Sequence, residues 1–186
     1  MSTMEVYNLE NAPEESKKYM EQAKEKFGFV PNVLGVMAES PAVIGGYMTL
    51  SGIFASSSLS AAECQIILLS ASVENGCTYC VAAHSGGAAA VGVEASVITA
   101  LRSDAPVEDA RLEALRRFTQ KIVTSHGWPE DDDLQDFLDT GFSKAQALEV
   151  LLGITVKTLS NYVNHLAHTP LDDALKPMAW EGRSES

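Results

Sequence analysis

Positive charge, aromatic side chains and cysteine are all scarce in this sequence. Lysine and arginine total 13 against 25 aspartates and glutamates, which gives a formal net charge of −12. Because an acidic surface repels phosphate backbones and anionic lipid headgroups, this balance argues against nucleic-acid binding and against membrane-surface binding. No apolar run approaches the roughly 18 residues that a membrane-spanning helix needs.

The usual features of an exported protein are also missing. Residues 1–9 have neither the basic start nor the apolar run of a signal peptide. Three cysteines in 186 residues are too few, and odd in number, for a disulfide scaffold. We therefore expect a cytoplasmic protein. With 46% of its residues hydrophobic, the chain can bury a sizeable core, and we expect residues 1–186 to form a single domain.

Apolar residues recur at helical spacing between clear stop signals, and almost no segment alternates as a half-buried strand does. This pattern predicts an all-α fold. The expected helices cover approximately residues 11–27, 31–37, 41–50, 60–75, 77–91, 94–102, 107–125, 130–138 and 144–165. Most of residues 51–60, which are small and polar, are expected to form a loop. Residues 170–186 are expected to form a tail that frays past Trp180.

Two segments of the chain resemble each other. An offset of 83 positions aligns Ser60 with Ser143 and Tyr79 with Tyr162, and each segment is a serine-started helix with a large apolar face. One interpretation is an internal helical repeat. The other is that buried helices with similar caps look alike.

The residues that can carry chemistry are Cys77, Cys80 and His84. If a helix begins at Cys77, cysteines three apart lie on one face within disulfide reach. Both fall in the first turn, where the helix dipole and free N–H groups favour a thiolate. His84 lies one turn beyond Cys80 and can accept its proton. This spacing predicts Cys80 as the thiolate that attacks peroxide oxygen and Cys77 as the resolving thiol.

Three other interpretations of the pair remain open at this stage. A thioredoxin-like enzyme would instead use the first cysteine as the nucleophile. The pair with His84 could form three ligands of a zinc site, the fourth coming from Cys64, His126, His165 or His168. The cysteines could also be buried and inert, since cysteine is among the most commonly buried residues. Cys64, alone on an apolar helix, is expected to be core filler.

The string Asn-Gly-Cys-x-x-Cys-x-x-x-His at residues 75–84, after an apolar helix and before the Val-Gly-Val turn at 91–93, resembles the AhpD-like, carboxymuconolactone decarboxylase superfamily. It is most similar to the alkylhydroperoxidase-type branch, which keeps both cysteines. The likeness is sharpest over residues 59–92 and extends to residues 31–33 and 157–162. It implies an all-α helical bundle with an internal helical repeat.

The resemblance also implies roles for individual residues. Cys77 and Cys80 match the resolving and peroxidatic cysteines, and His84 matches the histidine that relays the proton. The family pattern places a glutamate twelve residues before the first cysteine, where this sequence has Gln65. An amide can hydrogen-bond a water or orient His84, but it cannot accept the proton.

Two glutamates are alternatives to Gln65 in this relay. Glu63 lies two residues away, about 200° around an α-helix. It also has a competing role, because Ser60 and Glu63 have the spacing of a capping box at a helix start. Glu74 is the third candidate and could lie at the mouth of the site.

These observations predict a thiol-dependent hydroperoxide reductase, an antioxidant peroxidase of peroxiredoxin type, that an external dithiol or protein reductant regenerates. The reaction needs no metal, haem or flavin cofactor. The alternative is a thiol–disulfide oxidoreductase or redox sensor with little peroxidase activity, and a third possibility is a zinc-stabilised or purely structural oligomer. The resemblance implies a homo-oligomer, for which residues 30–37 and Trp180 are expected to offer apolar surface.

Overall fold

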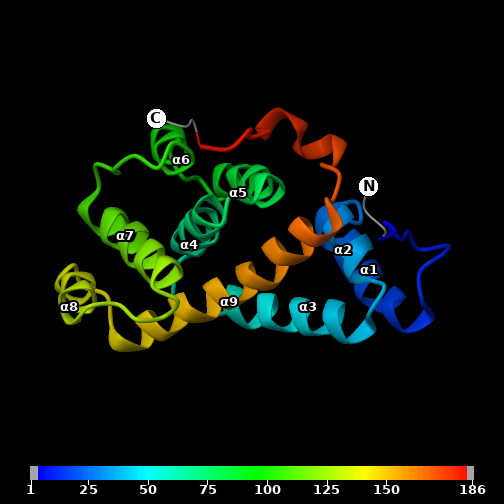
Figure 1. Ribbon diagram of the computed structural model, residues 1–186, viewed down its shortest axis with the longest axis horizontal. Coiled ribbons are helices and arrows are strands. Elements are labelled where there is room, and N and C mark those ends of the chain that lie inside the picture. Colours follow the sequence, from blue (N-terminus) through cyan, green and yellow to red (C-terminus); the bar gives the residue numbers. More distant parts are fainter. Residues whose placement is uncertain (1–3, 184–186) are drawn as a thin grey trace.

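The computed structural model describes residues 4–183, which form helices joined by short connections (Figure 1). The elements are α1 (Glu14–Phe27), α2 (Asn32–Met37), α3 (Pro41–Ala55), α4 (Ala61–Glu74), α5 (Thr78–Ala90), α6 (Ala95–Arg102), α7 (Ala110–Thr124), α8 (Asp131–Asp139), α9 (Lys144–Ala167) and the 3-10 helix η1 (Asp173–Met178). No strand occurs in this part of the chain, so the prediction of an all-α fold is confirmed. None of these helices is long and apolar enough to span a membrane.

Helix α4 occupies the centre of the fold. Ser60 and Glu63 form the expected capping box at its start, each side chain bonding the other residue's backbone N–H. Most of its side chains are buried, because α5, α6, α7 and α9 all pack against it. In Figure 1, α9 crosses diagonally below α4 and α5, and the C-terminal segment passes above α5 towards α6.

The two similar segments differ in the course of the backbone. Ser143 and Gln146 form a capping box at the start of α9, as Ser60 and Glu63 do for α4. The first segment then turns at Gly76, whose φ of 65° is accessible to glycine at little cost, and continues as α5. The second runs unbroken as one helix of 24 residues. A similar start therefore leads to two helices in one segment and to one in the other.

The prediction of a loop at residues 51–60 is wrong for the first half of this segment, since α3 continues to Ala55. The reason is tertiary packing. Phe54 is buried on this last turn and lies against Gly153 of α9, where an added Cβ would come within 2.7 Å of the Phe54 ring. Burial of this one aromatic side chain outweighs the loop-like composition around it.

Two expectations about the ends of the chain also need correction. Val33, Leu34, Val36 and Met37 are buried, so α2 is part of the core and does not offer apolar surface. The tail does not fray directly after Trp180. The Trp180 indole donates to the carbonyl of Arg102, and Arg183 forms ion pairs with Glu74 and Asp104. Residues 184–186 of the predicted tail lie outside the described part.

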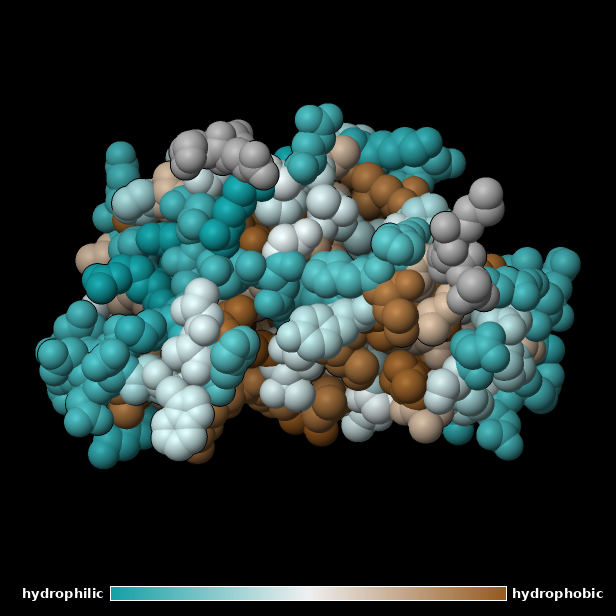
Figure 2. Space-filling view, in the orientation of Figure 1, coloured by the Kyte–Doolittle hydropathy of each residue, from teal (hydrophilic) through white to brown (hydrophobic). Residues whose placement is uncertain are grey.

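Exposed apolar side chains gather mainly on α9 and the facing turn of α3. Figure 2 shows hydrophobic residues at the lower centre of this face, where α3 and α9 lie in Figure 1. The large exposed apolar residues of these two helices are Ile53, Leu148, Leu151, Tyr162 and Leu166. This surface is where an oligomer contact would be sought, and the homo-oligomer itself stays a prediction.

Candidate active site

The two cysteines lie at the start of α5, deep in the molecule. Cys77 is the N-cap residue and Cys80 falls in the first turn, as the spacing predicts. Both are free thiols, and their exposed fractions are only 1% and 2%. The turn before them is anchored from the other side, since the Asn75 amide donates to Oδ1 of Asn161 on α9.

A polar stripe on α9 faces this pair. Lys157, Ser160, Asn161 and Asn164 follow helical spacing and are all buried. Nδ2 of Asn164 donates to Cys80 Sγ at 3.2 Å and lies 3.8 Å from Cys77 Sγ. The Ser160 hydroxyl is 3.8 Å from Cys80 Sγ. The donors of α9 therefore converge on the second cysteine.

Lys157 adds a full positive charge to this cluster. Its Nζ lies 3.8 Å from Cys80 Sγ and 2.6 Å from Nε2 of His84. Burial lowers the pKa of Lys157, but the negative charge at Cys80 outweighs this effect and raises it above its ordinary value. The side chain is 1% exposed, so its ammonium group depends on the groups around it for compensation.

The environment separates the two sulfurs electrostatically. A hydrogen bond from the Cys77 thiol and the positive charge of Lys157 lower the pKa of Cys80, against the opposing effect of burial. The same hydrogen bond, together with burial, raises the pKa of Cys77. At neutral pH the arrangement therefore favours a Cys80 thiolate beside a Cys77 thiol, and the catalytic roles of the two cysteines stay a prediction.

His84 lies between Lys157 and Gln65. Its Nδ1 is 3.0 Å from Oε1 of Gln65, and its Nε2 faces Lys157. Burial and the charge of Lys157 lower its pKa well below the ordinary value, so the imidazole is neutral. Gly87, one turn of α5 away, leaves room for the Gln65 amide, because a Cβ there would lie 2.8 Å from Oε1.

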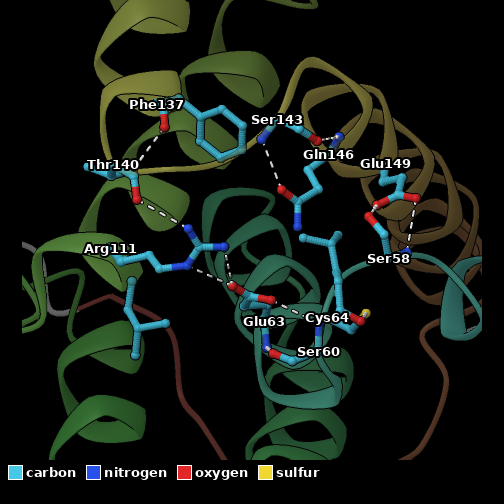
Figure 3. Close-up of polar contacts among 12 residues, drawn as sticks. Ser58, Ser60, Glu63, Cys64, Arg111, Phe137, Thr140, Ser143, Gln146 and Glu149 are labelled. Carbon is cyan, nitrogen blue, oxygen red and sulfur yellow. Dashed lines mark hydrogen bonds and ion pairs between the residues drawn. The ribbon is translucent and has the colours of Figure 1, made fainter.

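Neither glutamate considered for the relay contacts His84. The carboxylate of Glu63 accepts two hydrogen bonds from Arg111 and one from the Ser60 backbone, as Figure 3 shows. Glu74 pairs with Arg183 instead. Of the three candidates, the structure brings only Gln65 to the histidine, which agrees with the half-turn offset between positions 63 and 65.

Tyr79, between the two cysteines, fixes α5 to distant parts of the chain. Its hydroxyl donates to the carboxylate of Asp172 and lies 3.4 Å from the backbone N–H of Val33. Asp172 also accepts from the backbone N–H of Asn32 at 3.1 Å. The start of α2, the cysteine helix and the segment after α9 therefore meet at one buried phenol.

The sequence analysis did not single out Lys157, Ser160, Asn161 or Asn164. Two signals could have found them. Residues 157–161 lie within a stretch that carries the family resemblance, and the four polar residues share one face of a helix that is otherwise rich in apolar residues. Lys157 is 1% exposed, so its charge must be compensated by a residue from another element, and the periodicity of the sequence does not predict which residue that is.

The described residues do not assemble a metal site. Among residues 4–183, no group of three histidine, cysteine, aspartate or glutamate side chains is placed to hold a metal ion. Cys64, the remaining cysteine, is buried on α4 near Ser57, and burial raises the pKa of its thiol. Surface hollows between α7 and α8 and along the outer face of α9 are not lined by Cys77, Cys80 or His84.

Comparison with known proteins supports the fold and the motif. Residues 47–121, which include both cysteines and His84, match the model of the carboxymuconolactone decarboxylase family. Among curated proteins, a search finds no match.

Solved structures share the fold at low sequence identity. One is an alkylhydroperoxidase AhpD core, an uncharacterised peroxidase-related protein from Ralstonia eutropha JMP134, with TM-score 0.82, 21% identity and 94% of each chain covered. A peroxidase-related protein from Silicibacter sp. TM1040 has TM-score 0.79, 22% identity and coverage of 93% of this chain and 92% of its own. The debrominase Bmp8, as a cysteine-to-alanine variant with 2,3,4-tribromopyrrole, has TM-score 0.81, 16% identity and 96% coverage of both chains.

The family-model match covers the cysteine helix and the central helix α4, and the fold agrees with AhpD-like proteins over almost the whole chain. Over residues 47–121 the chain is therefore similar to the carboxymuconolactone decarboxylase family, and its fold is similar to that of AhpD-like proteins.

Proposed function

We propose that the protein is a thiol-dependent hydroperoxide reductase. The observation that carries the proposal is the asymmetry of the buried pair. Cys80 receives donors from Cys77, Asn164 and Lys157, whereas the pKa of Cys77 is raised. One thiolate beside one thiol is the starting state that peroxide reduction by a cysteine pair requires.

In the proposed reaction, Cys80 Sγ attacks the terminal oxygen of the hydroperoxide. The new S–O bond forms as the O–O bond breaks, and the alkoxide leaves as an alcohol after it takes up a proton. The Cys77 sulfur then attacks the sulfenic acid on Cys80, releasing water and closing the disulfide. An external dithiol reduces this disulfide and is itself oxidised.

A thiol–disulfide oxidoreductase or redox sensor is the runner-up. Exchange with a protein partner requires a partner sulfur to reach Cys77 or Cys80 in line, and both are at most 2% exposed. A small hydroperoxide needs far less access than a protein sulfur does. This burial supports the peroxidase ahead of protein thiol exchange in the oxidative half-reaction.

The test is a stopped-flow titration of the fully reduced protein with cumene hydroperoxide, followed by mass spectrometry to assign the oxidised thiols. We expect loss of two thiols, at Cys77 and Cys80. Cys64→Ser is the matched control, since this thiol is also buried but carries no comparable set of donors, and it should leave the rate unchanged. Thiols that survive excess peroxide but exchange readily with a dithiol–disulfide couple would instead establish the oxidoreductase.

Two single variants separate the roles of the sulfurs. Cys80→Ser should abolish peroxide consumption, and Cys77→Ser should leave one sulfenic acid that a dimedone-type probe traps. Trapping in the Cys80 variant alone would reverse the assignment. Because a variant of the debrominase Bmp8 binds 2,3,4-tribromopyrrole, this compound is tested as an alternative oxidant in the same assay. Thiol loss with this compound, but not with hydroperoxide, would replace the proposed substrate class.

A further inference from the structure

Lys157 lies in the core and has no carboxylate partner among residues 4–183. Its side chain is among the largest fully buried ones, and none of the ion pairs found among residues 4–183 involves it. The titratable groups that face it are Cys77, Cys80 and His84 from α5 and Tyr47 from α3. Of these, Cys80 is the group that supplies a negative charge, so the ammonium at 157 and the thiolate at 80 depend on each other.

The hydrogen bonds fix the protonation of His84. A glutamine Oε1 only accepts, so Nδ1 of His84 carries the hydrogen and donates it to Gln65. The lone pair at Nε2 is then left to accept from Lys157 Nζ, 2.6 Å away. The nitrogen that could take a proton is therefore already occupied by the lysine, and Lys157 is the group that faces both Cys80 and His84.

We propose that Lys157 carries the proton of the redox cycle. As an ammonium it pairs with the Cys80 thiolate, it delivers its proton to the alkoxide that leaves, and it stays neutral while the disulfide is closed. His84, held by Gln65, is the positioning residue that keeps the lysine nitrogen in place. This inference rests on the proposed attack of Cys80 on a hydroperoxide.

The atoms and charges of this cycle balance. The reduced protein holds two exchangeable protons, one on the Cys77 thiol and one on the Lys157 ammonium. Attack by Cys80 gives a sulfenic acid and an alkoxide, which leaves as the alcohol with the proton of Lys157. Closure of the disulfide expels hydroxide, which leaves as water with the proton of Cys77. The dithiol reductant returns both protons, one to Cys77 and one through Cys80 to Lys157.

The neutral lysine of the oxidised state follows from burial. When the disulfide forms, Cys80 no longer carries a charge, and an ammonium without an anion in the core is strongly unfavourable. The neutral amine can still hydrogen-bond His84. An amide at position 65 suits this arrangement, because it accepts from Nδ1 without adding a negative charge that would favour the imidazolium form.

The decisive measurement is the proton balance of oxidation. Reduced wild-type protein is oxidised with hydrogen peroxide at pH 7 in weak buffer with a pH indicator, and disulfide is counted by mass spectrometry. We expect no net proton uptake, because both protons come from the protein. Uptake of one proton per disulfide would mean that Lys157 stays an ammonium in the oxidised state, and would overturn the inference.

Two variants test the pairing of Lys157 with Cys80 in the reduced state. Lys157→Met removes both charge and donor, and Lys157→Gln keeps a donor for His84 without the charge. We expect the thiolate absorbance at 240 nm to titrate near or above the ordinary cysteine pKa of about 8.5 in both. At pH 7 that leaves about 30-fold less thiolate, and the peroxide rate should fall accordingly and recover as the pH is raised.

Lys144→Met is the matched control, because Lys144 is an exposed lysine at the start of the same helix, and it should behave as wild type. Circular dichroism confirms that each variant is folded before titration. If Lys157→Met titrates as wild type does, the inference is wrong even where peroxide is consumed. If wild type consumes no peroxide, the proposed function fails, and the thiolate titration still decides whether Lys157 holds the charge of Cys80.

Discussion

The hydroxyl of Tyr79 donates a hydrogen bond to the carboxylate of Asp172, although 93 residues separate the two in the sequence. Tyr79 stands between the two cysteines, and Asp172 follows α9 on the segment that passes over α5. Burial and this carboxylate raise the pKa of Tyr79, so the phenol keeps its proton and remains a donor. The position of the cysteine helix thus depends on a contact with the C-terminal part of the chain.

Tyr79→Phe should destabilise the protein by about 1.5–3 kcal/mol, the usual value of a hydrogen bond to a charged group. The measurement is urea unfolding, with a lower midpoint and an unchanged slope. Tyr7→Phe is the control, because it removes a tyrosine–glutamate bond of 2.7 Å to Glu39 at the surface. Equal midpoints for the two variants would show that the buried contact contributes no more than the exposed one.

The cysteine pair and its histidine could be predicted because their relationship is local. Three residues within two turns of one helix have a spacing that fixes their mutual placement. Helix starts such as Ser60 and Ser143 were predictable for the same reason, since a capping box lies within four residues.

Lys157 could not be predicted in this way. It meets Cys80 across 77 positions of sequence, and the register between α9 and α5 is set by tertiary contacts, for example by the hydrogen bond from Asn75, just before α5, to Asn161 of α9. The loop expected before Ser60 failed for a related reason, since burial of Phe54 extends α3. The choice between Glu63 and Gln65 depends on which side of α4 faces His84. Arg111, which binds Glu63, comes from another helix.

Glu63→Gln should leave the peroxide rate unchanged and lower the stability modestly. A glutamine at this position can still accept from the Ser60 N–H, so the variant removes the ion pair with Arg111 alone. With the Arg111 side chain 37% exposed, about 0.5–1 kcal/mol is expected. Glu63→Ala, which also removes the capping bond, should cost more. A changed rate of peroxide reduction in a well-folded Glu63→Gln protein would indicate that this carboxylate takes part in the proton relay.

This contribution of Glu63 should depend on pH in a defined direction. Burial raises its pKa, but the hydrogen bonds from Ser60 and Arg111 outweigh this and hold it below the ordinary value of 4.5. A lowered folded-state pKa contributes stability above the unfolded pKa and loses it as the pH falls through the folded value. The difference between wild type and Glu63→Gln should therefore be full at pH 7 and shrink below about pH 4.5, as urea unfolding at several pH values would show.

Gly153→Ala should destabilise the contact between α3 and α9. The added methyl group would lie 2.7 Å from the Phe54 ring and 2.9 Å from Ile67, both buried, so we expect a loss of about 1–3 kcal/mol. Gly52→Ala on α3 is the control, since nothing lies within 4 Å of its added Cβ. That variant should gain about 0.5–1 kcal/mol from helix propensity. A Gly153→Ala protein with the wild-type free energy of unfolding would contradict this prediction and would mean that α3 and α9 can shift apart at little cost.

Gly87→Ala should slow the reaction with hydroperoxide while the fold is kept. Its added methyl group would lie 2.8 Å from Oε1 of Gln65, which is the end of a flexible side chain and can swing away. His84 then loses the acceptor of its Nδ1 hydrogen. If this lost hydrogen bond, which orients His84, raises the activation free energy by about 1 kcal/mol, the second-order rate constant with cumene hydroperoxide at pH 7 should be roughly fivefold lower.

Gly86→Ala is the control beside it, because its added Cβ meets only Met178 at 3.9 Å. It should keep the wild-type rate and gain a little stability. Gln65→Ala should slow the reaction as much as Gly87→Ala does, and the double variant should be no slower, since both remove the same hydrogen bond. Losses that add in the double variant would show that Gly87→Ala acts on the cysteine helix itself and not through Gln65.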